Sequence, residues 1–240
     1  MKPSHPSVIY QDASILIADK PNGLTVIPER FNTTKPCLQS ILEEKYGKLW
    51  VVHRIDRETS GLVCFARDED SHRNISKQFE SRGVRKFYKV VVSGRLEGTE
   101  GEIDSPIIER PHKLGTMMVS PKGKEALTLF TVEEQFRSCA LLRVEIKTGR
   151  THQIRVHMAA AGHPLLVDSV YGQHENFMLS SIKKKYKQSE EEEKPIISRL
   201  TLHAYELELT HPVTGERMKF TSPLPHDMET LLKVLRKYDM

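Results

Sequence analysis

The amino-acid sequence predicts an α+β fold built on a mixed, mainly antiparallel sheet. Strand-like runs outnumber helix-like runs, and the two kinds do not alternate strictly, as they would in a doubly wound fold. We expect strands near residues 14–18, 49–52, 62–66, 87–92, 127–132, 140–146, 200–209 and 217–221. We expect helices near residues 37–45, 70–80, 153–161 and 226–238.

Length and composition bound the class of protein. The chain has 240 residues, of which 38% are hydrophobic and 28% are charged, and this predicts a single globular domain over residues 1–240. No apolar run approaches the ~20 residues needed to span a bilayer, and the N-terminus has no apolar signal core. Cys37, Cys64 and Cys139 form no CxxC pair. We therefore expect a cytoplasmic protein with no membrane partner and no zinc site.

The stretch HRIDRETSGL, residues 53–62, is the most informative motif. It places Asp56 between Arg54 and Arg57, with strand-like runs on both sides. We therefore predict that Asp56 lies on a tight connection between two strands. Neighbouring cations favour an ionised carboxylate, which suits a nucleophile or a general base. A surface loop of alternating charges is the other interpretation, and the local pattern alone favours it.

A second motif reads TGRTHQIRVHMAAAGHPLL, residues 148–166. It predicts a helix with Thr151 as its N-cap and an end near Gly162. Arg150 and Arg155 then lie around the helix start, where backbone N–H groups also favour anions. A third segment, KFYKVVV, places Tyr88 on a strand.

These three segments together resemble the RluA-type pseudouridine synthases, whose motifs are HRLD-x-x-TSG, K-x-Y and G-R-T-H-Q-I/L-R-x-H. SILIADKPNGLTVIP and LTLHAYELELTHPVTGE extend the resemblance to nearly the whole chain. It implies a curved central sheet with a cleft, and isomerisation of uridine in tRNA or rRNA without a nucleotide cofactor or metal. Many members carry an S4-type domain before the first strand; we expect none here, and we expect RNA recognition to come from the catalytic domain itself.

The resemblance also implies roles for individual residues. Asp56 becomes the catalytic carboxylate, and Arg155 becomes the cation that keeps it ionised, with a phosphate contact on the helix surface as the alternative. Tyr88 is expected to pack against the flipped base, although local sequence alone favours a core aromatic. Further substrate contacts are expected from Arg54, Arg57, Thr59, Arg150, His152, Gln153 and Leu166.

Several of these substrate assignments have structural alternatives. Arg54 can fill the space left by the flipped base, or make a phosphate contact or a surface ion pair. Histidines such as His152 are more often structural, and Thr59 can serve to fix its loop. Val167 stands where the family has Gly, and a β-branched residue resists positive φ, so the chain path after it is expected to differ.

Two segments of the sequence are interpreted as insertions. Residues 105–126 form either a mobile surface loop or a flap that touches RNA. Residues 173–198 contain KKKYKQSEEEEK and are expected to be solvated and partly disordered. The net charge of +4 permits RNA binding without requiring it. The alternative function is a catalytically silent RNA-binding protein. A phosphotransferase is not favoured, because this sequence lacks the motifs of that class. We expect the protein to be a monomer.

Overall fold

A computed structural model describes residues 5–29, 34–183, 186 and 193–240. The chain forms two compact units. The first unit comprises Met1–Phe87 and His203–Pro223, and the second comprises Tyr88–Leu202 and Leu224–Met240. The chain passes from one unit to the other within β5 (Arg85–Ser93) and again at the start of β11 (Leu202–Thr210). The sequence predicts a single domain over residues 1–240, and the division into two units leaves this a prediction.

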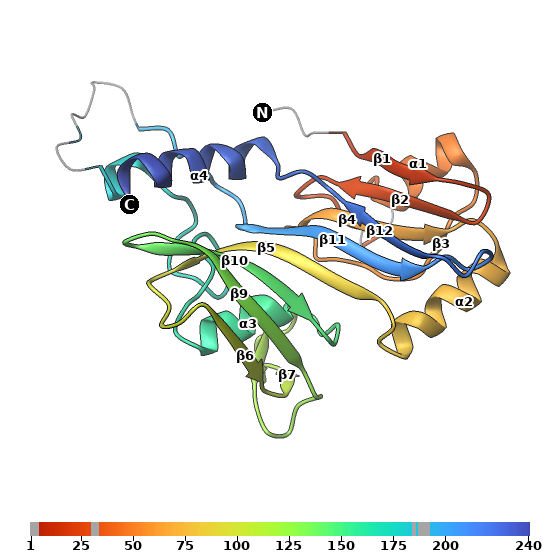
Figure 1. The fold of residues 1–240 in the computed structure, drawn as a ribbon, viewed down its shortest axis with the longest axis horizontal. Coiled ribbons are helices and arrows are strands. Elements are labelled where there is room, and N and C mark those ends of the chain that lie inside the picture. The colour runs from red at the N-terminus through yellow and green to blue at the C-terminus, as the bar shows by residue number, and fades with distance from the viewer. Residues whose placement is uncertain (1–4, 30–33, 184–185, 187–192) are drawn as a thin grey trace. The chain divides into compact units, whose positions relative to one another are not determined.

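The sheet of the first unit is mixed. β1 (Ser7–Gln11), β2 (Ile15–Lys20) and β4 (Ser60–Ala66) are antiparallel neighbours, and β3 (Trp50–Val51) also pairs with β4. β11 then runs parallel to β4, and β12 (Arg217–Thr221) is antiparallel to β11. This arrangement and the sheet of the second unit confirm the mixed, mainly antiparallel α+β class (Figure 1).

Both faces of this sheet are covered, because successive strand residues point to opposite faces. On one face, Ile15 and Leu62 belong to a buried cluster with Ile75 of α2 (Glu69–Glu80). On the other face, Leu16 and Val63 belong to a cluster with Leu38 of α1 (Leu38–Tyr46), and Figure 1 shows the two helices flanking the strands. A strand between two covered faces needs apolar residues at consecutive positions, which is why β4 reads as an unbroken buried run.

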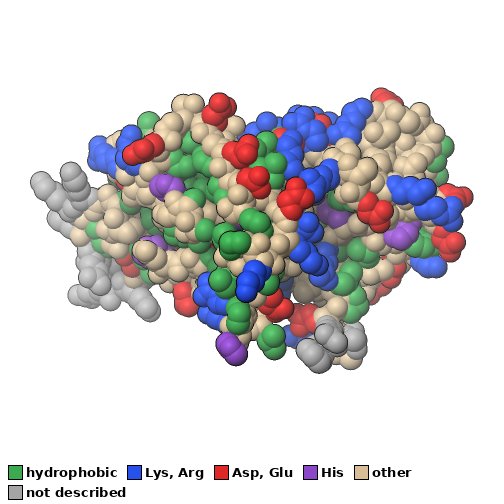
Figure 2. Space-filling view, turned by 90° about the horizontal axis from the view of Figure 1, so that it is seen from below, with side chains coloured by type: hydrophobic (Ala, Val, Ile, Leu, Met, Phe, Trp, Pro, Cys, Tyr) green, Lys and Arg blue, Asp and Glu red, His purple; other side chains and the backbone are tan. Residues whose placement is uncertain are grey.

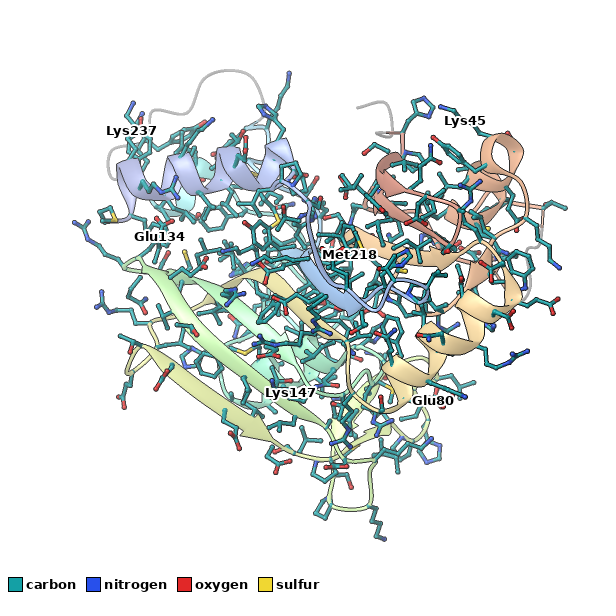
Figure 3. All side chains as sticks on the ribbon, turned by 45° about the vertical axis from the view of Figure 1, so that its right-hand side comes forward. Lys45, Glu80, Glu134, Lys147, Met218 and Lys237 are labelled. Carbon is teal, nitrogen blue, oxygen red and sulfur yellow. The ribbon has the colours of Figure 1, made fainter. Side chains whose placement is uncertain are left out.

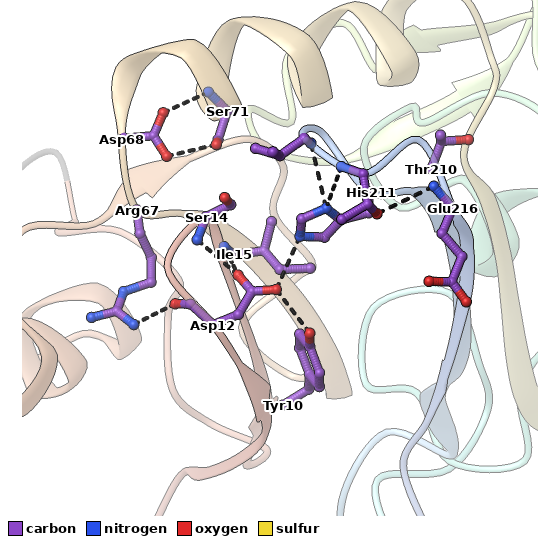
Figure 4. A network of polar contacts seen from close by, with 12 residues as sticks. Tyr10, Asp12, Ser14, Ile15, Arg67, Asp68, Ser71, Thr210, His211 and Glu216 are labelled. Atoms are coloured by element: carbon purple, nitrogen blue, oxygen red, sulfur yellow. Dashed lines mark hydrogen bonds and ion pairs between the residues drawn. The ribbon is translucent and has the colours of Figure 1, made fainter.

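Asp12 joins two turns of the first unit (Figure 4). Its carboxylate accepts hydrogen bonds from the Ser14 and Ile15 backbone at 2.7 and 2.8 Å, which fix the β1–β2 turn. The same carboxylate lies 2.9 Å from His211 Nε2, at the β11–β12 turn. The Val213 and Thr214 backbone N–H groups both donate to His211 Nδ1, so Nε2 carries the proton that is donated to Asp12.

In the second unit, the order of hydrogen-bonded strands is β5, β10 (Cys139–Ile146), β9 (Leu127–Gln135) and β6 (Glu100–Asp104). A separate hairpin, β7 (Ile107–Glu109) and β8 (Met117–Val119), lies within the segment expected to be a loop or flap. α3 (Gln153–Ala160) and α4 (His226–Tyr238) lie on opposite sides of this sheet, and η1 (Leu179–Ser181) is a short 3-10 turn.

α4 covers its side of the sheet through Met228, Leu231, Leu232 and Leu235, which recur at helical spacing and are buried. At the outer end, Arg236 binds both carboxylate oxygens of Glu134 on β9, and Figure 3 labels Glu134 together with Lys237. Among the described residues, no helix has the length and apolar content needed to cross a membrane.

The predicted insertion at residues 173–198 is described only in part, because residues 184–185 and 187–192 lie outside the described residues. Its two ends are built into the second unit. Phe177 and Ile197 pair across an isolated bridge and are both buried in the cluster that α4 covers. These ends are therefore core rather than solvated, and the charged run KKKYKQSEEEEK falls mostly on the residues that are not described.

Candidate active site

The Asp56 loop, residues 52–59, connects β3 to β4, as the sequence predicts. The Thr59 backbone N–H donates to the Asp56 carbonyl at 3.1 Å, so residues 56–59 form a closed β-turn. Asp56 is half-buried, whereas Arg54 and Arg57 are exposed. Arg57 takes part in exposed ion pairs with Glu29 and Glu58 at 3.6 and 3.5 Å. A two-strand scaffold thus presents the carboxylate on a tight connection.

Lys20 fastens the second half of this loop through the Arg57 carbonyl. It is fully buried, and its Nζ donates to the carbonyls of Pro21, Leu24 and Arg57 at 3.0, 2.7 and 3.0 Å. An ammonium group has three donors, so all of them are matched by carbonyl oxygens. A buried lysine is costly without such partners, and this one links the end of β2 to the residue that follows Asp56.

The turn after β2 adds two further contacts to the Asp56 loop. The Gly23 N–H donates to the Arg57 carbonyl at 2.9 Å, and the Asn22 side chain donates to the Glu58 carbonyl. The KPNGL segment and the Asp56 loop are therefore one hydrogen-bonded structure, although about three dozen residues separate them in the chain.

His53 fastens the start of the Asp56 loop to β4. Its Nε2 accepts the Cys64 backbone N–H at 2.9 Å, and its ring stacks on Phe79 of α2 with centroids 4.6 Å apart. Burial, with a smaller contribution from the charge of Lys86, lowers the pKa of His53 to about 3. The ring is therefore neutral at pH 7, with its proton on Nδ1, and it acts as a structural acceptor.

The end of the Asp56 loop is fastened by Ser60, at the start of β4. Ser60 Oγ lies 3.0 Å from His203 Nδ1, and His203 Nε2 lies 3.3 Å from the Ser222 carbonyl. A carbonyl only accepts, so Nε2 carries the proton and Ser60 donates to Nδ1. The TSG and LHA motifs thus meet where β4 and β11 run in parallel, with His203 opposite Ser60.

Gly61 allows these two strands to approach closely. Its φ is +112°, and a Cβ added there would lie 2.2 Å from the Ala204 carbonyl oxygen. The same glycine pairs with Lys20 on β2. Only a residue without a side chain fits between these neighbours, and this explains why glycine ends the TSG motif here.

Arg155, on α3 of the second unit, is buried and forms a forked ion pair with Asp168. Its Nε and Nη2 donate to the two carboxylate oxygens at 2.7 and 2.8 Å. The alternative in which Arg155 is a surface residue is therefore wrong. Burial alone would raise the pKa of Asp168. The hydrogen bonds and charge of Arg155, with two backbone N–H groups from Val170 and Tyr171, outweigh burial and hold this pKa below its usual range.

Tyr171 and His152 extend this ion pair. The Arg155 guanidinium lies over the Tyr171 ring at 5.0 Å from its centroid. The Tyr171 hydroxyl accepts the Met117 N–H at 2.7 Å and lies 2.8 Å from His152 Nδ1. The hairpin β7–β8, through Met117, is thus joined to the helix that carries Arg155.

The start of α3 differs from the prediction. His152, not Thr151, is the N-cap residue, and it has a left-handed φ of 55° without a side-chain cap. Gln153 fastens the segment before the helix, because its Oε1 accepts from the Arg150 N–H and from the Thr148 hydroxyl. The Gln153 amide also donates twice to β9, which favours a positioning role over the predicted substrate contact.

The remaining predicted residues have separate places. Tyr88 lies on β5 and is buried, and Leu166 is buried in the cluster beneath α4. Arg150 Nε donates to the Glu125 carbonyl at 2.8 Å. Val167 keeps a negative φ, so the loss of glycine there imposes no left-handed residue. The pairing of Asp56 with Arg155 and the RNA contacts stay predictions.

Sequence reasoning missed two groups that the structure places beside the predicted ones. Lys20 was visible only as part of KPNGL, and Asp168 only as the end of HPLLVD. Charged residues are rarely buried without partners, and the sequence around Lys20 or Asp168 does not show which partners they have. The signal available in each case was a charge in or beside an apolar strand-like run.

Comparisons with known proteins agree with this architecture. The human proteins RNA Pseudouridylate Synthase Domain Containing 1 and Containing 4 share the fold, each with a TM-score of 0.73. The first is 22% identical and aligns over 100% of this chain and 99% of its own, and the second is 24% identical and aligns over 96% and 93%. The chain therefore has the fold of these two pseudouridylate synthase domain proteins.

A family model for RNA pseudouridylate synthase matches residues 14–160, and the chain belongs to this family. A ribosomal large subunit pseudouridine synthase D from Pseudomonas aeruginosa is 37% identical over 96% of this chain and 72% of its own length. Proteins of the same name from Neisseria meningitidis serogroup B and Nitrosomonas europaea are 35% and 36% identical over 95% of this chain. The chain spans 61% and 65% of those two relatives.

Proposed function

We propose that this chain is an RNA pseudouridine synthase that isomerises uridine in tRNA or rRNA, with Asp56 as its catalytic carboxylate. The observation that carries the proposal is the construction of the Asp56 loop. Lys20, His53 and Ser60 fasten the loop on both sides of one turn, so the turn presents its carboxylate from a rigid scaffold. Such preorganisation is what a reaction without a cofactor requires of the protein.

The proposed reaction conserves atoms. The bond between N1 of uracil and C1′ of ribose breaks, the base turns, and a bond from C5 to C1′ forms. C5 loses a proton to solvent and N1 gains one, with no change of oxidation state. An ionised carboxylate at the sugar serves this reaction either as a nucleophile or as a base, and Asp56 is assigned to this position.

The other site residues take roles around Asp56. Arg155 is assigned to keep the carboxylate ionised, in addition to the fork that its Nε and Nη2 form with Asp168. Tyr88 is assigned to stack against the flipped base, an interaction that contributes ~1–3 kcal/mol. Arg54 and Arg57, both exposed on the Asp56 loop, are assigned to the RNA backbone or the emptied stack.

The large ribosomal subunit RNA is the first substrate to test, because several relatives are named for that subunit. Lys and Arg side chains occur in several groups on the face shown in Figure 2, with acidic residues between them. This mixed surface suits local contacts to RNA rather than one continuous basic track. A monomer in the cytoplasm is part of the same proposal.

The experiment is tritium release from RNA labelled at C5 of uridine, with total tRNA and rRNA assayed in parallel. We expect release from one pool by the wild type and none by Asp56→Asn, which should still bind RNA. General acid–base groups contribute about 10²–10⁴-fold, so turnover by this variant at about a tenth of the wild-type rate would contradict the assignment of Asp56.

Asp70→Asn is the matched control. Asp70 is exposed on α2 and pairs only with its helical neighbour Arg73 among the described contacts, at 2.9 Å. Asp70→Asn makes the same chemical change as Asp56→Asn in the same unit, so the activity of this control variant should equal that of the wild type. RNA binding without release from either pool by the wild type would instead identify a catalytically silent RNA-binding protein.

A further inference from the structure

Thr59 and Ser60 are adjacent buried hydroxyl residues with opposite hydrogen bonding. Their exposed fractions are 2% and 3%. Ser60 donates to His203, as described above, whereas Thr59 Oγ1 has no hydrogen-bond partner. Across the described part of the chain, it is the one buried side-chain nitrogen or oxygen in this condition. A buried hydroxyl without a partner costs the free energy of its lost hydration, and no hydrogen bond within the protein offsets this cost. A buried threonine at this position therefore needs a physical explanation.

The position of Thr59 supplies a candidate partner. Thr59 and Asp56 are the last and first residues of the closed β-turn, joined by the 3.1 Å bond from the Thr59 N–H to the Asp56 carbonyl. The Cα atoms at the two ends of such a turn lie less than ~7 Å apart. A threonine hydroxyl carries one donor, and an ionised carboxylate only accepts. The donor and acceptor are thus complementary in type and come from the two ends of one short turn.

We propose that Thr59 is a positioning residue whose hydroxyl donates to the Asp56 carboxylate in the RNA-loaded enzyme. This inference rests on the proposed function. The hydroxyl is unpaired in the resting protein and becomes paired only as Asp56 acts on the sugar of the bound RNA. A hydrogen bond made only at that stage stabilises the transition state without also stabilising the resting enzyme. It holds one carboxylate oxygen, so that the other is aimed at the ribose.

Thr59→Val tests the proposal, because valine keeps the shape and removes the hydroxyl. The measurements are the single-turnover rate at saturating enzyme, the RNA dissociation constant, and the midpoint of urea unfolding. We expect the rate to fall about 10- to 100-fold, the range set by one hydrogen bond to a charged group. We expect the dissociation constant to stay within about twofold of wild type and the unfolding midpoint to stay or rise, because no resting contact is lost.

Two further variants separate the hydroxyl from the scaffold. Thr59→Ser restores the donor and should recover the rate to within about threefold of wild type. Ser60→Ala removes the neighbouring hydroxyl, which is bonded to His203 in the resting protein, and should lower the unfolding midpoint. A loss of stability in Ser60→Ala, with none in Thr59→Val, is expected if one hydroxyl serves the reaction and the other serves the fold.

Several results overturn the inference. If the Thr59→Val rate stays within about twofold of wild type, the unpaired hydroxyl has no role in the reaction. If Thr59→Ser loses as much rate as Thr59→Val, the loss does not come from removal of the hydroxyl. Weaker RNA binding with an unchanged saturating rate makes Thr59 a substrate contact instead. In each case the wild type is active, so the proposed function stands. A wild type without turnover on any RNA overturns both.

Discussion

The Asp56 loop and the segment around Arg155 carry the two charges of the proposed site, and they are held by different kinds of contact. The Asp56 loop is fastened through its backbone carbonyls, a neutral histidine and a serine hydroxyl. Arg155 is fastened through a buried ion pair with Asp168, which in turn accepts two backbone N–H groups. These described contacts of the first arrangement involve the loop backbone and residues that flank Asp56, whereas those of the second involve the Arg155 guanidinium itself.

This difference predicts different costs of mutation. Contacts to the backbone of a loop are many and individually modest, so losing one leaves the others in place. A buried ion pair is stable only as a pair, because removing one partner leaves an uncompensated charge in a low-dielectric interior. Substitutions around Arg155 should therefore affect stability and activity together, whereas Asp56 itself should be replaceable without loss of fold.

The largest effect is expected from Asp168→Ala. Arg155 would remain buried without the Asp168 carboxylate, and breaking such a pair typically costs about 3–5 kcal/mol of unfolding free energy. Urea unfolding measures this directly. Asp70→Ala is the control, since its exposed pair with Arg73 should contribute about 1 kcal/mol or less. Equal stability of the two variants would show that the Arg155 fork contributes no more than a surface ion pair.

A somewhat smaller loss is expected from Gly61→Ala, which strikes the scaffold of the Asp56 loop. The new Cβ would overlap the Ala204 carbonyl oxygen, and its backbone would keep a φ of +112°. Strain and overpacking each typically cost about 1–3 kcal/mol, so we expect a loss of about 2–4 kcal/mol in urea unfolding.

Gly215→Ala provides a control for the backbone term. Gly215 also has a positive φ, +73°, but an added Cβ would meet no atom within 4 Å. It should lose only about 1 kcal/mol. The difference between the two variants isolates the close approach of β4 and β11. If Gly61→Ala and Gly215→Ala prove equally stable, the close approach is not what requires glycine at position 61.

Much of the fold was predictable because its signals are local. The spacing of Met228, Leu231 and Leu235 after Pro225 gives the bounds of α4, and the predicted range for β12 is also confirmed. β1 was missed because its apolar run is only three residues long, from Val8 to Tyr10, and its side chains alternate between exposed and half-buried. The hairpin β7–β8 was missed because each strand has only three residues.

The site was predictable in its residues but less so in its contacts. The turn that carries Asp56 is confirmed, because strand-like runs on both sides leave room only for a short connection. The ion pair of Arg155 with Asp168, which lies 13 residues further along, was not predicted. The pairing of Arg155 with Asp56 stays a prediction beside it. Such pairings depend on how segments pack, and no periodicity in the sequence encodes them.

The smallest effect expected here concerns His53 and pH. Its pKa is about 3 in the folded protein, against an ordinary value of 6.5, mainly because the ring is buried. Below pH 6.5 the unfolded chain binds a proton that the folded protein does not. The contribution of His53 is therefore complete above that pH and is lost as the pH falls towards 3. The slope is at most about 1.4 kcal/mol per pH unit for one proton.

His53→Gln tests this linkage, because glutamine does not titrate and offers an oxygen to the Cys64 N–H. Urea unfolding at pH 7.5 and pH 5.5 gives the change in stability for each protein, and the variant should lose less than wild type by up to about 1.4 kcal/mol. His226→Gln, at an exposed histidine, should behave as wild type. An identical pH dependence in wild type and His53→Gln would mean that His53 takes up its proton in the folded state, and the Asp56 loop would then contain a charge as the Arg155 segment does.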